Sequence, residues 1–258
     1  MGLEGLDEDL TVEALAVDMP GRPVRSYPAL LSTEADALAW ARSGAPDGAV
    51  VTAGYQASPR GRAGLPWEVR QGSGLAFSLV LRPELGAERE GWAYTVATSG
   101  LADALGEGVT IAWPDEVRRG GTRVGAVGAW VELGAEGVQW AVVNVLVPGV
   151  APPRGATLAR VVAAIEGCLR APAEMVLADY RARCETLGRP VRARLIPLGP
   201  SGPQVEGRAV DALADGALVI ETVRGARVAV RPQNLGLLDE LDPSSSPTQE
   251  AGGGPTPR

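Results

Sequence analysis

The sequence contains neither lysine nor histidine, so all 24 of its basic residues are arginine. Without histidine, zinc sites and Ser-His-Asp triads are close to excluded. Without lysine, the chain has no Schiff-base nucleophile and no point-charge phosphate binder. A GC-rich coding bias accounts for the abundance of Ala, Gly, Arg and Pro, but the chemical consequence is the same.

Long apolar runs are missing as well. No run of 18 apolar residues exists, and the acidic N-terminus has no basic segment followed by an apolar core. We therefore expect a cytoplasmic protein that neither spans a membrane nor is secreted. A net charge of −7 argues against general affinity for nucleic acid. The only cysteines, Cys168 and Cys184, are expected to be reduced thiols rather than a disulfide or metal pair.

A basic loop rich in glycine follows Tyr55 and leads into an apolar strand that ends before Pro83. The run from Leu75 to Leu81 has the composition of a buried strand. In the loop, arginine forks and free backbone N–H groups can hold an anion, and glycines let the chain approach a ligand. A solvated surface loop is the alternative. We call residues 56–73 the glycine/arginine loop.

This loop resembles that of the biotin–protein ligases, Q-x-x-G-R-G-R-x-G-R-x-W followed by a glycine and an apolar strand containing serine. Pro59 stands at the first glycine, and Leu65 replaces the last arginine. In the family this loop closes over biotin and the adenylate, so the resemblance gives its arginines that role. The residues in register, without a gap, are Gln56, Arg60, Gly61, Arg62, Gly64, Trp67, Gly72 and Ser78.

Two shorter segments also resemble the family. Ser32 and Thr33 precede a predicted helix, at the position where the family carries the two hydroxyls that face the biotin ring. Glu34 replaces the Asn that usually follows them in the family. A plain helix cap is sufficient to explain Thr33. The tetrapeptide that starts at Trp113 and ends at Glu116 resembles W-P-N-D, which supports the substrate pocket. Without this resemblance, the tetrapeptide is interpreted as a strand-ending turn with a solvated acidic tail.

The residues near the reactive centre depart from the family. Arg123 stands where the family has the lysine that interacts with both the biotin carboxyl and the α-phosphate. Arginine keeps the charge but is bulkier and planar. Leu146 replaces a glycine, and Pro148 replaces the Asn that helps receive the nucleotide. A leucine where the backbone must approach a ligand argues against an intact nucleotide pocket.

The predicted fold is α+β: a mixed sheet backed by helices, similar to class II aminoacyl-tRNA synthetases and biotin ligases, and then a small SH3-like barrel. Pro172 is expected to interrupt the helices between 157 and 187. Residues 1–24 are too few for the winged helix-turn-helix of repressor-type ligases, so no DNA-binding role is expected. The predicted divisions are an N-terminal extension (1–24), a catalytic domain (25–187), the barrel (188–241) and a disordered tail (242–258).

The resemblance implies an AMP-forming enzyme that uses ATP, biotin and Mg²⁺, with no metal held by the protein itself. Biotin becomes biotinyl-AMP and passes to a lysine of the biotin carboxyl carrier domain of a carboxylase. The alternative is a catalytically impaired paralogue that binds a ligand or protein. Lipoate or octanoate transfer is a third option, and a homodimer is compatible with the family. The candidate catalytic residues are Arg123 and Arg62, and the candidate substrate-binding residues are Ser32, Thr33, Gln56, Arg60, Gly61, Arg62, Gly64, Trp67 and Trp113.

Overall fold

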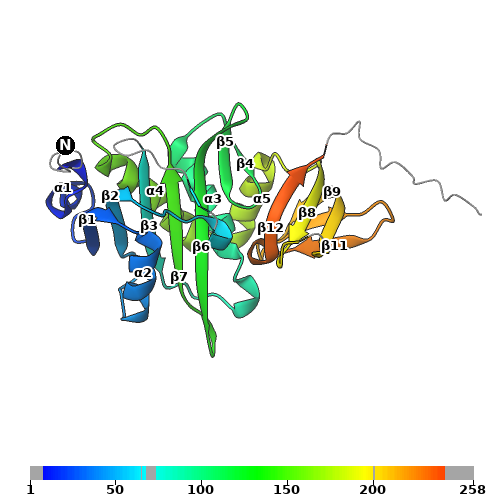
Figure 1. Cartoon of the computed structure of the whole chain (residues 1–258), viewed down its shortest axis with the longest axis horizontal. Helices are drawn as coiled ribbons and strands as arrows, with labels where there is room; N and C mark the ends of the chain where they lie inside the picture. Colours follow the sequence, from blue (N-terminus) through cyan, green and yellow to red (C-terminus); the bar gives the residue numbers. More distant parts are fainter. Residues whose placement is uncertain (1–7, 65, 68–73, 200, 242–258) are drawn as a thin grey trace, which may run out of the picture.

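The computed structural model describes residues 8–64, 66–67, 74–199 and 201–241. Seven strands form a mixed sheet: β1 (Val24–Leu30), β2 (Val50–Gln56), β3 (Leu75–Leu81), β4 (Val109–Ala112), β5 (Glu116–Arg119), β6 (Thr122–Gly134) and β7 (Gly137–Val147). Their order is β1-β2-β3-β7-β6-β5-β4 (Figure 1). β1 is parallel to β2, and the other neighbouring pairs are antiparallel.

One face of this sheet carries the main core. It packs against α3 (Trp92–Leu105) and α4 (Gly155–Arg170), and α5 (Ala173–Arg183) follows after Pro172 at its N-cap. The two longer helices approach closely at Gly100, where a Cβ atom would lie 2.5 Å from the Ile165 Cα. The predicted strand 75–81 is confirmed, and all seven of its residues are buried because both faces of the sheet are covered there. The predicted interruption at Pro172 is confirmed too.

The opposite face is covered at one end by α2 (Thr33–Arg42). Ser32 caps this helix through a hydrogen bond that its hydroxyl accepts from the Glu34 N–H at 3.2 Å, so the cap is Ser32 and not Thr33. The buried face presents Ala37 and Ala41 to the sheet. Gly128, on the central part of this sheet face, lies beside Gly61 and Arg62 of the glycine/arginine loop.

Five further strands form a small antiparallel, barrel-like sheet at the C-terminal end (Figure 1): β8 (Pro190–Leu195), β9 (Gln204–Ala212), β10 (Leu218–Glu221), β11 (Arg227–Val230) and β12 (Leu235–Glu240). Their order is β11-β10-β9-β8-β12. The small sheet packs directly on the large one, since the Trp113 indole Nε1 donates to the Gly216 carbonyl at 2.9 Å. The α+β fold class predicted from the sequence is confirmed.

The remaining elements are short. They are η1 (Glu8–Leu10), α1 (Val12–Asp18), η2 (Arg62–Gly64), η3 (Ala87–Arg89) and η4 (Pro232–Asn234). Cys168 and Cys184 are free thiols, as predicted. Among the described residues, no helix has the length and apolar composition needed to cross a membrane. The tail predicted to be disordered, 242–258, lies outside the described residues.

Candidate functional site

Buried polar side chains cross the sheet on the face that α2 covers. Ser78 of β3 pairs with Asn144 of β7, and the Ser78 Oγ lies 2.8 Å from the Asn144 Oδ1. The Ser78 Oγ also lies 2.8 Å from the Thr33 Oγ1 at the start of α2. The Thr33 N–H and hydroxyl donate to the Gln56 Oε1 at 2.8 and 3.2 Å. We call Thr33, Gln56, Ser78 and Asn144 the polar row.

The polar row is unusual because apolar residues lie on both sides of it along the strands. Val80 and Val142 pack against α2 on one side. On the other side, Ala76, Ala126 and Leu146 form a separate apolar cluster with Trp67 packed against it. Buried polar groups are costly unless they are hydrogen-bonded, and a ligand entering here must replace the bonds of the row. The row offers hydroxyl and amide groups, which both donate and accept.

Asn144 was not among the candidate site residues. It is 3 % exposed, and its Oδ1 accepts a hydrogen bond from the Ser78 Oγ. The signal that could have identified it is an amide within the otherwise apolar run from Trp140 to Val147. Burial raises the pKa of Glu34, while the nearby Arg60 and Asn144 act in the opposite direction.

The glycine/arginine loop lies directly against the sheet at Gly128, the residue of β6 that pairs with Asn144. A Cβ atom on Gly128 would lie 2.9 Å from the Gly61 carbonyl carbon and 3.1 Å from the Arg62 N. A Cβ atom on Gly61 would in turn lie 2.2 Å from the Trp67 Nε1. Glycine at 61 and 128 therefore allows the loop to lie this close to the polar row. Arg60 points outward and donates to the Gly64 carbonyl at 3.2 Å.

Arg62 connects the loop to the C-terminal sheet. Its side chain is 7 % exposed, and its Nε donates to the Asp115 Oδ2 at 3.1 Å. The two terminal nitrogens donate to the backbone carbonyls of Leu235 and Gly236 in β12. Asp115, read from the sequence as the start of a solvated acidic tail, is instead largely buried. Burial raises its pKa even though Arg62 acts in the opposite direction.

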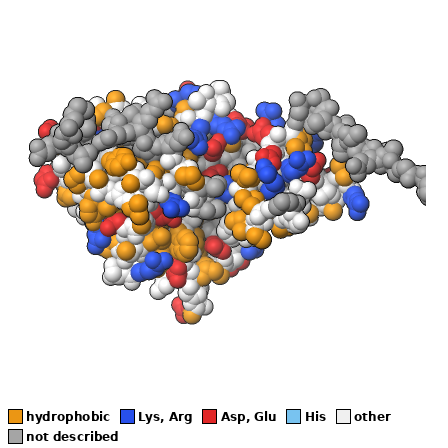
Figure 2. All heavy atoms as spheres, in the orientation of Figure 1, with side chains coloured by type: hydrophobic (Ala, Val, Ile, Leu, Met, Phe, Trp, Pro, Cys, Tyr) orange, Lys and Arg blue, Asp and Glu red, His pale blue; other side chains and the backbone are white. Residues whose placement is uncertain are grey.

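A cleft of about 450 Å³ lies between the large sheet and the C-terminal sheet. Arg62 and Arg123 line it together with Trp67 and Trp113. Figure 2 shows acidic and basic side chains close together near this junction. The carboxylates in the lining are all paired: Asp115 with Arg62, Glu116 with Arg118 and Arg123, and Glu240 with Arg118.

Arg123 faces this cleft because of an irregularity in the sheet. The register between β5 and β6 shifts after Val117, so Arg123 pairs with Arg118 and lies on the same face as Glu116. Its Nη1 lies 3.4 Å from the Glu116 Oε1, and its side chain is 43 % exposed. Ala126 and Leu146 occupy the sheet between Arg123 and the polar row. Arg123 is thus separated from the polar row by an apolar surface.

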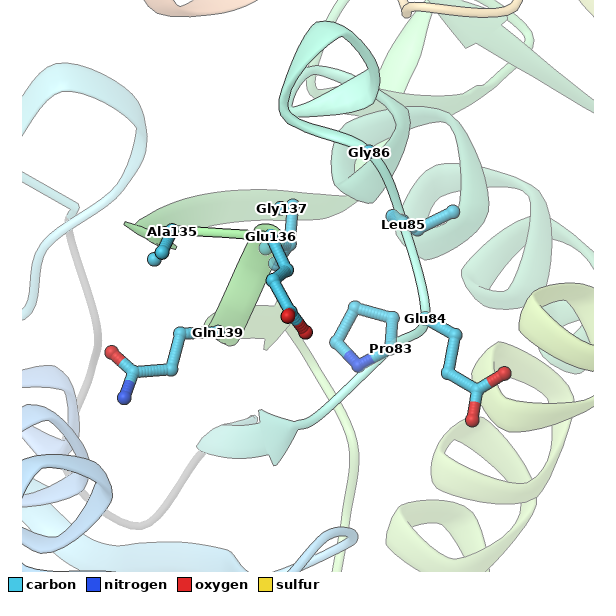
Figure 3. Close-up of a pocket in the computed structure, with 10 residues that line it drawn as sticks. Pro83, Glu84, Leu85, Gly86, Ala135, Glu136, Gly137 and Gln139 are labelled. Carbon is cyan, nitrogen blue, oxygen red and sulfur yellow. The ribbon is translucent and has the colours of Figure 1, made fainter.

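Two other cavities flank the sheet. One of about 410 Å³ lies on the Gly61 and Gly64 side of the loop, next to Glu34 and Trp130. Another of about 690 Å³ lies between the segment Pro83–Gly86 and the turn Ala135–Gly137 (Figure 3). Its lining includes two glutamates but no arginine and no predicted site residue, so it does not suit an anionic adenylate.

The predicted site residues fall into three groups. Ser32, Thr33 and Gln56 lie together at the start of α2, and Gly61 and Gly64 line the 410 Å³ cavity. Arg62, Trp67, Trp113 and Arg123 surround the 450 Å³ cleft, whereas Arg60 lies on the exposed side of the loop. In the described part of the chain, no three His, Cys, Asp or Glu side chains are grouped to hold a metal ion.

The chain is similar to several ligases in sequence. It is 31 % identical over 225 residues to the biotin–[acetyl-CoA-carboxylase] ligase of Mycobacterium tuberculosis, covering 77 % of this chain and 82 % of that protein. It is 29 % identical over 126 residues to the bifunctional ligase/repressor BirA of Bacillus subtilis, covering 47 % of this chain and 38 % of that protein. The second match thus spans well under half of its relative. No family model matches the chain.

Solved structures share the fold. The biotin protein ligase of Aquifex aeolicus in complex with biotin and ATP superposes with a TM-score of 0.65 at 19 % identity, covering 85 % of this chain and 99 % of that one. A biotin protein ligase-like protein of unknown function from Silicibacter gives 0.61 at 17 % identity, covering 83 % and 96 %. Taken with the identity and coverage of the mycobacterial relative, the chain belongs to the biotin protein ligase family.

Proposed function

We propose that the protein activates biotin with ATP and transfers it to a lysine of a biotin carboxyl carrier domain. The observation that carries this proposal is the buried polar row beneath the glycine/arginine loop. Biotin ends in a ring with two N–H donors and a carbonyl acceptor, and Thr33, Gln56, Ser78 and Asn144 offer the complementary groups. The mycobacterial relative is named as a ligase acting on acetyl-CoA carboxylase, which supports a carboxylase as the acceptor.

The chemistry has two steps. The biotin carboxylate attacks the α-phosphorus of ATP, and pyrophosphate leaves. The acceptor amine then attacks the acyl carbon, and AMP leaves. The protein contributes positioning and positive charge, for which the loop arginines are the nearest candidates. Mg²⁺ would be bound mainly by the nucleotide phosphates, since the carboxylates of the cleft are all paired with arginine.

The chain divides accordingly in this proposal. Residues 25–187 carry the ligand-binding sheet, and residues 188–241 form the SH3-like unit that closes one side of the cleft. Arg62 joins the two through its bonds to Asp115 and to the β12 backbone. Arg62 would therefore act mainly by holding the loop in place, with Arg60 as the loop arginine available to a ligand.

A second candidate is an impaired paralogue that binds biotin without activating it. Two observations favour it: Arg123 pairs with Glu116 rather than facing the polar row, and buried Leu146 fills the surface between them. A compact lysine ammonium is replaced by a planar guanidinium that is held by another partner. Under this candidate, the site keeps the ring-binding end and loses the nucleotide-binding end.

One experiment decides between these candidates. The protein is incubated with ATP and with biotin, lipoate or octanoate, and both pyrophosphate and acyl-adenylate are measured, the latter by mass spectrometry. Pyrophosphate and biotinyl-adenylate from the biotin arm alone support the ligase. Product in the lipoate or octanoate arm redirects the assignment to transfer of that acyl group.

Thermal stabilisation by biotin without pyrophosphate supports the impaired paralogue. In that case Arg123→Lys alone is expected to stay inactive, because Leu146 and Pro148 still differ from the family. The combination of Arg123→Lys, Leu146→Gly and Pro148→Asn is expected to recover turnover. Absence of both stabilisation and product with all three acids would defeat both candidates.

A further inference from the structure

Asp9 of η1 joins the N-terminal segment 8–18 to the start of α4. Its Oδ2 accepts hydrogen bonds from the Arg154 N–H at 2.6 Å and from the Arg154 Nε at 2.9 Å, and its Oδ1 accepts one from the Arg154 Nη2 at 2.7 Å. The side chain of Arg154 is 2 % exposed and that of Asp9 is 12 % exposed. A carboxylate bonded both to a helix N-terminus and to a guanidinium makes strong, charge-assisted hydrogen bonds. These bonds from Arg154 hold the pKa of Asp9 below its usual range.

Apolar packing holds the same segment in place. Leu10 and Leu15 are buried in the main core. A Cβ atom on Gly155 would lie 2.3 Å from the Asp18 Oδ2 and 3.5 Å from the Leu15 Cδ2, so α1 lies directly against the first turn of α4. The segment 8–18 is therefore a packed part of the fold, and the bonds of Asp9 have a fixed geometry.

On its other side, Arg154 contacts the residue that directly follows the glycine/arginine loop. The Arg154 Nη1 donates to the Gly74 carbonyl at 3.4 Å, and the Gly74 N–H donates to the Val150 carbonyl at 3.1 Å. Gly74 has a φ of 93°, which favours glycine, and a Cβ atom there would lie 3.3 Å from the Pro148 Cα. A continuous set of contacts thus runs from Asp9 to the end of β7.

This end of the sheet is the nucleotide-binding end in the proposed function. Pro148 stands where the family has the Asn that helps receive the nucleotide. Gly74 closely precedes Ala76, which belongs to the apolar cluster beside Trp67. The polar row lies farther away, because Ser78 is about 13 Å from Gly74 along an extended strand. A displacement of Gly74 should therefore alter the nucleotide-binding end and leave the polar row in place.

We propose that Asp9 is a positioning residue for the adenylate: through Arg154 it fixes Gly74, and Gly74 fixes the segment at which β7 ends. This inference rests on the proposed ligase function. Asp9 acts through Arg154 and does not itself contact the ligand. The N-terminal segment, expected from the sequence to be an extension that precedes the catalytic domain, thereby contributes to the nucleotide-binding end of the site.

A second ion pair between the N-terminal part of the chain and α4 provides a matched control. Arg22 donates to the Glu166 carboxylate at 2.7 and 3.0 Å, and also to the Gly48 carbonyl at 2.7 Å. Glu166 lies about 18 Å farther along α4 than Arg154. Loss of the Glu166 charge therefore removes a comparable contact of the same helix at a distance from Gly74.

The test measures, by titration calorimetry on the full chain, the binding of biotin and of a non-hydrolysable analogue of biotinyl-adenylate. All variants are compared at a temperature well below the lowest Tm among them. Asp9→Asn is expected to weaken binding of the analogue by about 10- to 100-fold and to leave biotin binding unchanged. Glu166→Gln should lower the Tm but keep the wild-type affinity for both ligands. Asp9→Glu keeps the carboxylate, so its affinity for the analogue should lie between those of wild type and Asp9→Asn.

Several results would overturn the role of Asp9. Wild-type affinity of Asp9→Asn for the analogue would do so, as would equal losses in Asp9→Asn and Glu166→Gln, or equal losses for biotin and the analogue. If Asp9→Asn does not fold, Asp9→Glu carries the test, and a lowered Tm with wild-type affinity for the analogue would overturn the proposal. A wild type that binds neither ligand, or biotin alone, would instead defeat the ligase function on which the inference rests.

Discussion

Removal of the Arg62 side chain is expected to destabilise the protein strongly, because the residue is buried and fully engaged. Arg62→Ala leaves the largely buried Asp115 without its cation and leaves the carbonyls of Leu235 and Gly236 without donors. Loss of one partner of a buried ion pair costs about 3–5 kcal/mol. For a chain of this size, that corresponds to a fall in Tm of roughly 6–20 °C.

The effect of Arg62→Ala should depend on pH. Arg62 holds the pKa of Asp115 down against burial, so the variant raises this pKa further above its unfolded value. A carboxyl whose folded pKa is raised contributes stability at low pH and loses it as pH rises through the folded pKa. The difference in free energy of unfolding between wild type and variant should therefore become smaller as the pH falls from 7.5 to 5. Urea unfolding at both pH values measures it.

Two controls separate the buried pair from general charge loss. Arg123→Ala removes an exposed pairing with Glu116 and should change stability by about 0–1 kcal/mol. The double variant Arg62→Ala/Asp115→Asn should recover part of the loss, because no buried charge is left unpaired. A loss from Arg62→Ala that is below about 1 kcal/mol, or that is the same at both pH values, would refute the reasoning.

Three further predictions follow from close contacts and burial. Gly128→Ala should lower the free energy of unfolding by about 1–3 kcal/mol and abolish stabilisation by biotin, because the new Cβ atom meets the loop backbone. Gly167→Ala, on an open side of α4, should instead raise the free energy of unfolding by about 0.4–1 kcal/mol. Thermal melts with and without biotin compare the two variants. Ser78→Ala should lower the free energy of unfolding by about 1–3 kcal/mol, because it leaves groups of the polar row unpaired. Ser43→Ala on the surface should change the free energy of unfolding by almost nothing. Equal effects of the two variants in urea unfolding would contradict the geometry. Cys168 is partly buried, and burial and Asp103 raise its pKa to about 12, so it should resist iodoacetamide at pH 8 until the protein is unfolded. Rapid labelling of Cys168 in the native chain would contradict this raised pKa.

Elements whose pattern is local could be predicted from the sequence. The apolar run 75–81 matches β3 residue for residue, because strong apolar composition bounded by glycine or proline leaves few alternatives. The buried face of α2 could not be predicted in this way. Alanines occupy positions 35, 37, 39 and 41, so the sequence offers little contrast between the faces. The structure buries Ala37 and Ala41 on this helix.

The site shows the same division between local and distant information. The resemblance to the family was sufficient to group Ser32, Thr33 and Gln56, and the structure brings them together. The environments of Arg62 and Asp115 depend on partners far away in sequence, so a loop arginine and an acidic residue after a turn gave no sign of burial. Asn144 was overlooked because the strand was compared with a glycine pattern that it lacks.

The bond between Arg62 and β12 also constrains how the protein is made. Arg62 lies in the first quarter of the chain, whereas its carbonyl partners at Leu235 and Gly236 lie 173 and 174 residues later. During synthesis, the loop cannot adopt this arrangement until β12 has left the ribosome. The described loop conformation is therefore available only to chains that include β12, and a product terminated before β12 would lack it even with its large sheet assembled.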